Sequence, residues 1–177
     1  MRLVLAAALA LFASPAFAFS LTSPDVSEGA TFPTPFVCPQ NGGHNVSPAL
    51  NWTDAPAGTK SFAVTIHDPD APVKGGFWHW LVADIPADAT GLAQNAGAPG
   101  GGSLPAGSTP LPNGAKQASY LGPCPPAGKP HHYEITVWAL PDAKATLTAG
   151  MTPSDIGAWL AKIATAKATL TPIYAKP

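Results

Sequence analysis

The chain has 177 residues with a formal net charge of −1, and it contains 22 prolines and 17 glycines, while 11% of its residues are charged and 46% are hydrophobic. This composition excludes a disordered chain and collagen, and it disfavours long helical bundles, because proline and glycine interrupt nearly every helical window. Arg2 is the only arginine and the lysines do not cluster, which excludes nucleic-acid binding. We expect one compact domain rich in strands and turns.

The first 18 residues have the pattern of a secretory signal peptide. Arg2 precedes an apolar run from Leu3 to Phe12, and a stretch of small residues ends at Ala18, after which we expect cleavage. The apolar run is too short to span a membrane, so no transmembrane segment is predicted. A buried N-terminal helix is the alternative. Residues 19–177 are then expected to form a single domain of a periplasmic or secreted protein.

Five segments within residues 30–140 have the pattern of β-strands. Ala30–Val37 and Ala49–Trp52 are short candidates. Ser61–His67 alternates apolar and polar residues, which predicts a half-buried strand. Phe77–Ile85 and Tyr133–Leu140 are each followed by a proline, which cannot donate to a sheet and ends the strand.

The segment Gly91–Ser119 consists largely of Gly, Pro, Ala and Ser. It is too long for an ordinary connection, and we expect an excursion or flap within the same domain.

One helix is predicted near the end of the chain. Thr152–Asp155 has the capping residue, first-turn proline and acidic third position of a helix start. Apolar residues then recur at helical spacing: Ile156, Trp159, Leu160 and Ile163. We expect this stripe to pack against a sheet rather than to bind a partner. Thr169–Tyr174 is a candidate for a last strand.

Cys38 and Cys124 are the two cysteines of the chain. In an oxidising compartment an even pair favours one disulfide. Two separate thiols, or a metal pair with histidines, are the alternatives that the residues leave open.

The motifs of several enzyme classes are missing. Gly122–Pro130 has five residues between its glycines where a phosphate-binding P-loop needs four, and Pro130 takes the place of the metal-binding hydroxyl. The chain has no Gly-x-Ser-x-Gly, His-Glu-x-x-His or Cys-x-x-Cys sequence. A nucleotide hydrolase, a serine hydrolase and a zinc protease therefore find no support.

Polar side chains gather at the ends of the predicted strands. Asp68 and Asp70 follow the first long strand, and the parity of Asp68 predicts that it emerges on the inward face. His79 lies between two tryptophans, on a strand face expected to be shared with Leu81 and Ile85. A plain turn at the aspartates and a packed histidine are the alternative interpretations.

The third cluster starts the last long strand. His131 and Tyr133 are two residues apart and should face the same way, whereas His132 should point to the other side with Glu134. A histidine at a strand start is commonly a surface residue. Two imidazoles, a carboxylate and a phenol brought together would instead form a small anion-accepting pocket, with positive charge available at mildly acidic pH.

Several motifs carry a family resemblance, in this order along the chain: Asn45–Trp52, Gly58–Ser61, Asp68–Pro72, Gly76–Val82 and Tyr120–Tyr133. Together they strongly resemble the phosphatidylethanolamine-binding protein family, and more closely its bacterial, Raf-kinase-inhibitor-like branch. The resemblance covers roughly residues 36–175, nearly all of the mature chain.

The resemblance implies a mainly β fold, with an antiparallel β-sandwich-like core and a few peripheral helices. It also implies a binding protein without catalysis or a cofactor, whose pocket receives phospholipid head groups or small phosphorylated ligands. Carried over to this sequence, the pocket residues are Asp68, His79, His131 and Tyr133, with Pro72, Pro125 and Pro126 at the rim.

The leading hypothesis is an exported binding protein for a small phosphate-type anion. Both pocket histidines and Tyr133 would donate hydrogen bonds, and Asp68 would orient a histidine tautomer. The alternative is an inhibitor or interaction factor that uses Gly91–Ser119 or the pocket rim against a partner such as an exported hydrolase. A weak metal-dependent hydrolase is a third hypothesis, without a spacing pattern to support it. Its ligands would be Asp68, Asp70, His79 and His131.

Overall fold

The computed structural model describes residues 18–176. The predicted signal peptide lies outside the described residues, apart from Ala18. No helix within residues 18–176 is long and apolar enough to cross a membrane.

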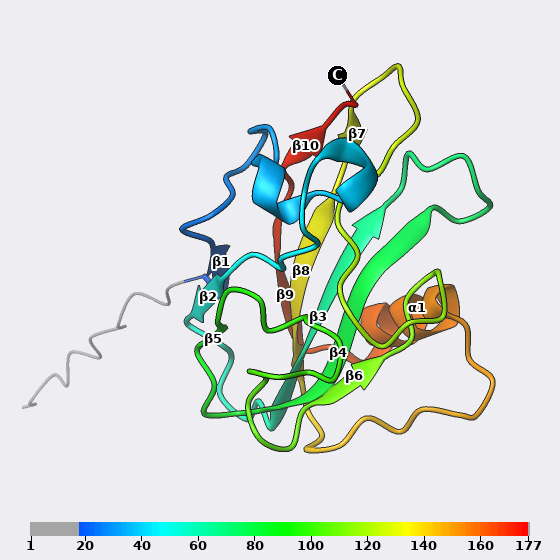
Figure 1. The fold of residues 1–177 in the computed structure, drawn as a ribbon. Helices are drawn as coiled ribbons and strands as arrows, with labels where there is room; N and C mark the ends of the chain where they lie inside the picture. The colour runs from blue at the N-terminus through cyan, green and yellow to red at the C-terminus, as the bar shows by residue number, and fades with distance from the viewer. Residues whose placement is uncertain (1–17, 177) are drawn as a thin grey trace, which may run out of the picture.

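A five-stranded antiparallel sheet forms the centre of the molecule (Figure 1). Its strands lie in the order β6 (Thr109–Leu111), β4 (Phe77–Pro86), β3 (Ser61–Asp68), β8 (Glu134–Leu140) and β9 (Ala166–Leu170). The three long strands predicted from the sequence are therefore confirmed, with ends that differ by a single residue.

Residues 18–176 also form two smaller antiparallel sheets. The first contains β1 (Ser20–Thr22), β2 (Leu50–Thr53) and β5 (Gly91–Leu92), and the second contains β7 (His131–His132) and β10 (Ile173–Tyr174). Strand β2 confirms the short candidate at Ala49–Trp52, and the C-terminal candidate is split between the end of β9 and β10.

The strand expected at Ala30–Val37 is wrong. Thr34–Phe36 forms a 3-10 turn instead. Pro33 and Pro35 flank and enter this turn, and a proline has no N–H with which to extend a ladder. The single β-bridge of this stretch joins Thr31 to Ile173.

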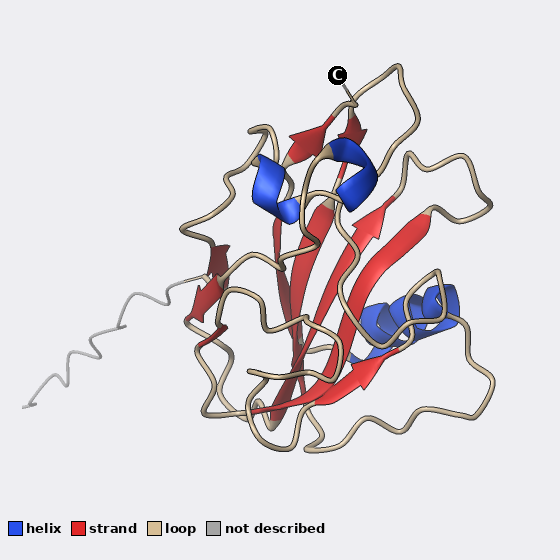
Figure 2. Cartoon of the chain, in the orientation of Figure 1, coloured by secondary structure: helices blue, strands red, loops and turns tan. Residues whose placement is uncertain are grey.

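The main apolar core lies between the central sheet and the sheet β1-β2-β5. Leu50 and Trp52 of β2 belong to the same buried cluster as Phe62, Val64 and Ile66 of β3. Apolar residues at alternate positions of β3 thus face the smaller sheet. The layered, mainly antiparallel architecture seen in Figure 2 confirms the predicted fold class.

The opposite face of the central sheet is covered by α1 (Pro153–Ile163). The predicted cap is present: Thr152 Oγ1 accepts a hydrogen bond from the Asp155 N–H, and the Asp155 carboxylate accepts one from the Thr152 N–H. Ile156 and Leu160 pack on sheet residues that include Ala63. Strand β3 is therefore buried on both faces, not half-buried as its alternation predicted.

The segment Gly91–Ser119 is largely built into the fold. Its start forms β5, and β6 pairs with β4 through Leu111 and Leu81 as the edge of the central sheet. Buried Asn113 closes the next turn by donating from Nδ2 to the Ser119 carbonyl over 2.9 Å. Strands β5 and β6 are therefore parts of sheets, and the sequence alone does not reveal this because their pairing depends on residues far along the chain.

Candidate binding site

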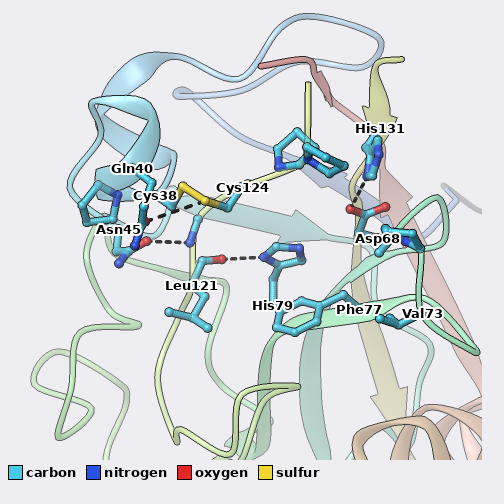
Figure 3. Close-up of a pocket in the computed structure, with 16 residues that line it drawn as sticks. Cys38, Gln40, Asn45, Asp68, Val73, Phe77, His79, Leu121, Cys124 and His131 are labelled. Carbon is cyan, nitrogen blue, oxygen red and sulfur yellow. Dashed lines mark hydrogen bonds and ion pairs between the residues drawn. A yellow bond between two sulfur atoms is a disulfide. The ribbon is translucent and has the colours of Figure 1, made fainter. Parts of the chain in front are cut away.

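A cavity of about 490 Å³ opens at the end of the central sheet where β3 stops and β4 begins (Figure 3). Its wall comes from five separate parts of the chain: residues 38–45, the end of β3 with the loop that follows, the start of β4, the loop 121–126, and β7 (His131–His132). The polar side chains on this wall are Gln40, Asn45, Asp68, His79 and His131.

Asp68 and His131 form a buried hydrogen-bonded pair on one side of the cavity. Asp68 ends β3 on the same face as Val64 and Ile66, as predicted, and only 3% of it is exposed. Its Oδ2 accepts a hydrogen bond from His131 Nδ1 over 2.7 Å, while Oδ1 accepts the Asp70 N–H over 2.9 Å. The carboxylate therefore fixes the ring of His131, as its predicted role of orienting a histidine tautomer requires.

His79 is held on the other side by two hydrogen bonds to one residue. Its Nδ1 donates to the Leu121 carbonyl over 2.8 Å, and its own carbonyl accepts the Leu121 N–H over 3.0 Å. Because a carbonyl can only accept, the ring proton lies on Nδ1. The second nitrogen, Nε2, makes no hydrogen bond to any residue within 18–176, and the ring lines the cavity.

An irregularity in the sheet turns His79 toward the cavity. Strand β3 pairs Ile66 with Trp80 and His67 with Trp78, so the ladder skips His79. An extra residue of this kind is a β-bulge, which redirects a side chain. The expected face-sharing with Leu81 is consequently wrong, since Leu81 packs on the helix side of the sheet.

Burial keeps the His79 ring neutral. Desolvation lowers the pKa of His79 to about 4, and the Leu121 carbonyl and the Asp68 carboxylate only partly oppose that shift. At neutral pH this ring presents an unprotonated Nε2, which is a hydrogen-bond acceptor.

Tyr133 lies behind the cavity wall. It is fully buried, its ring meets the His79 ring edge to face at 5.2 Å between centroids, and it is not among the lining residues. Its hydroxyl is buried and makes no hydrogen bond to a described residue. Burial, with a further contribution from the Asp68 carboxylate, raises the pKa of Tyr133 well above its ordinary value.

His132 points away from the cavity. Its N–H and its Nδ1 both donate to the Asp70 carboxylate, over 2.8 and 2.7 Å. Glu134 is also exposed and lies 3.5 Å from His67. The chain thus carries two adjacent Asp–His pairs, one inside the cavity and one on the surface.

The rim of the cavity is apolar. Pro72, Pro125 and Pro126 line it, as does Phe77 of β4. Val73 lies beside them and is 54% exposed.

A disulfide joins Cys38 to Cys124 in the cavity wall, which confirms the favoured pairing. Separate thiols and a metal pair are accordingly excluded. Within residues 18–176, no three His, Cys, Asp or Glu side chains are placed to hold a metal ion. Asp70, one of the four ligands of the hydrolase hypothesis, lies outside the cavity wall.

Two residues position the site although the sequence pattern assigned them no role of their own: Asn45 and Gly122. Asn45, with a φ of 53°, accepts the Gly122 N–H on its Oδ1 over 2.8 Å. A side chain on Gly122 would collide with the backbone carbonyl of Phe36, so only glycine fits here. Leu121 itself acts through its backbone, which leaves no side-chain signal in a sequence.

Comparisons with known proteins agree with this architecture. A family model described as phosphatidylethanolamine-binding protein matches residues 22–175. The UPF0098 protein YbcL of Escherichia coli is 42% identical over 166 residues, which cover 92% of this chain and 91% of YbcL. LppC of Mycobacterium tuberculosis, which is named as a lipoprotein, is 38% identical over 152 residues, covering 85% of this chain and 69% of LppC.

Two solved structures are similar over nearly the whole fold. The crystal structure of E. coli YbcL, described as a new member of the mammalian PEBP family, has a TM-score of 0.84 and covers 89% of this chain and 98% of its own. The PEBP homologue CT736 of Chlamydia trachomatis has 27% identity and a TM-score of 0.74, with 90% and 99% covered. This chain therefore belongs to the phosphatidylethanolamine-binding protein family.

Proposed function

We propose that this chain is an exported, non-enzymatic binding protein whose cavity takes a small phosphate-type anion, either free or as a head group. The observation that supports it best is the buried Asp68–His131 pair facing the same cavity as His79. No lysine or arginine is among the described residues of the wall. Positive charge for an anion must then come from a protonated histidine.

His131 is the residue that suits this task. Its Nδ1 already donates to the Asp68 carboxylate, so protonation places the new hydrogen on Nε2, where it can be donated to an anion. We expect affinity for anions to weaken as the pH rises above about 7.

The size and the rim of the cavity support a ligand larger than phosphate alone. About 490 Å³ lies within the ordinary range for small-molecule pockets, and the apolar rim formed by Pro72, Phe77 and Pro125 suits the carbon atoms of an esterified head group. A phosphate group would contact the histidines while its substituent lies along the prolines.

Two observations support export. The disulfide between Cys38 and Cys124 is typical of an oxidising compartment. The relative LppC is named as a lipoprotein. Cell fractionation followed by N-terminal sequencing tests this part: we expect a periplasmic or secreted protein that starts at Phe19, and an uncleaved cytoplasmic protein would contradict it.

Titration calorimetry tests the binding function. The purified protein with its disulfide intact is titrated with inorganic phosphate and with phosphoethanolamine at pH 5.5 and pH 8. We expect binding at pH 5.5 that weakens at pH 8. His131→Gln should abolish it, whereas His132→Gln, which alters the equivalent pair on the surface, should leave it unchanged. An absence of heat at both pH values would contradict the proposal.

The second candidate is an inhibitor of an exported hydrolase that acts through the rim. It is favoured by Val73, the one large apolar side chain that is exposed among residues 18–176. Much of Gly91–Ser119 is packed into the sheet, so the rim suits a partner better than that segment does. Val73→Asp should remove inhibition in a panel of exported hydrolases and spare phosphate binding; an unaffected or absent inhibition contradicts this candidate.

A further inference from the structure

We infer that the cavity selects phosphomonoesters and free phosphate over phosphodiesters, because His79 offers the ligand a hydrogen-bond acceptor rather than a donor. This inference rests on the proposed function and narrows it to one class of phosphate compound. It depends on which ring nitrogens of the two histidines are already engaged by the protein.

The proton of His79 cannot easily move from Nδ1 to Nε2. Nδ1 donates to the Leu121 carbonyl over 2.8 Å, and the Leu121 N–H is engaged by the His79 carbonyl over 3.0 Å. Moving the proton, or flipping the ring, would leave the partly buried Leu121 carbonyl without its donor. A second proton is disfavoured as well, because burial lowers the pKa of His79 to about 4.

His131 differs from His79 in the group behind it. The partner of its Nδ1 is the charged carboxylate of Asp68, 2.7 Å away, whereas His79 is backed by a neutral carbonyl. A carboxylate stabilises an imidazolium much better than a carbonyl does. When it is protonated, His131 can donate from Nε2, whereas the neutral ring of His79 accepts there.

The charged groups around the two rings agree with this asymmetry. The charge of Asp68 raises the pKa of His79, while His67 and His131 lower it. The ring of His79 also packs against Tyr133. His131 in turn faces Asp68, lies near the Asp70 carboxylate and pairs with Tyr174 in the sheet β7-β10. Of these two rings, only that of His79 lacks a carboxylate as its direct hydrogen-bond partner.

A phosphomonoester matches both nitrogens. Below its second pKa of about 6 it carries one P–OH group and anionic oxygens. The P–OH can donate to His79 Nε2, and an anionic oxygen can accept from the protonated His131 Nε2. A phosphodiester has no P–OH, so one of its oxygens would face the lone pair of His79. An unmatched buried acceptor of this kind reduces affinity by about tenfold to a hundredfold.

Ethyl phosphate and dimethyl phosphate are the appropriate probes. They are isomers with the same number of heavy atoms, and at pH 5 both are predominantly monoanions, so the P–OH is the main difference between them. Calorimetric titration at pH 5 should show ethyl phosphate binding to the wild-type protein at least about tenfold more tightly than dimethyl phosphate.

Variants assign the preference to His79. In His79→Gln the amide can donate or accept, so the ratio of the two affinities should fall close to one. In His79→Phe neither bond is available, and ethyl phosphate should weaken to the level of dimethyl phosphate. His132→Gln, on the surface, should keep the wild-type ratio.

The outcomes separate this inference from the proposed function. If wild-type protein binds both isomers equally, or prefers the diester, the inference is overturned and the anion pocket stands. If a folded His79→Gln or His79→Phe variant keeps the full preference, the assignment to His79 is overturned. If neither isomer nor inorganic phosphate binds, the proposed function itself fails.

Discussion

Replacing His79 with glutamine is expected to flatten the dependence of stability on pH below 6.5. In the folded protein the pKa of His79 is lowered from 6.5 to about 4, chiefly by burial. Between these values the unfolded chain binds a proton that the folded chain does not, so acid favours unfolding. The contribution of the neutral His79 ring to the free energy of unfolding is fully present at pH 7 and is lost as the pH falls toward 4. The total loss by pH 4 is about 3 kcal/mol.

Urea unfolding at pH 7.5, 6.5, 5.5 and 4.5 measures this effect. The free energy of unfolding of the wild type should fall more steeply toward pH 4.5 than that of His79→Gln, by about 2.5 kcal/mol between pH 7.5 and pH 4.5. His44→Gln is the matched control, because His44 is exposed, and it should keep the wild-type slope. Equal slopes for wild type and His79→Gln would refute the claim that His79 is neutral and buried.

Two further predictions concern the loops that form the cavity wall. Cys38 and Cys124 are separated by 86 residues, so Cys38→Ser with Cys124→Ser should lower the free energy of unfolding by up to about 4–5 kcal/mol on the chain-entropy estimate; a loss below about 1 kcal/mol in urea unfolding would contradict it. Gly122→Ala places a methyl group against the Phe36 carbonyl, so it should lower the free energy of unfolding by about 1–3 kcal/mol and weaken phosphate binding. Gly102→Ala is the control, because a methyl group there contacts no other atom, and it should be close to neutral in both assays.

Local sequence patterns were sufficient for most of the fold. The long strands and the capped helix are specified by alternation, by terminal prolines and by the residues Thr152–Asp155, which act over a few positions. The strand expected near Thr34 failed because prolines on either side prevent pairing. Strand β6 was missed since a three-residue edge strand is stabilised by its partner β4 rather than by its own composition.

The lining of the cavity was predictable in its residues but less so in its geometry. The resemblance identified six residues that do line the cavity, among them Asp68 and His131. The orientation of His79 depends on a skipped pair in the ladder between β3 and β4, which no periodicity reveals. Tyr133 was expected to contact the ligand, and it packs behind His79 instead because its large ring fills the core.

In the proposed function an anion lies between the two cavity histidines, and ¹⁵N NMR of the imidazole rings during a titration with inorganic phosphate at pH 5.5 tests this most directly. We predict that the Nε2 signals of His79 and His131 shift with saturation, and that the Nδ1 signal of His79 remains that of a protonated nitrogen bonded to Leu121. The signals of the surface residues His44 and His132 should not move. Shifts confined to those surface histidines, or no shift at His79 and His131, would contradict the account.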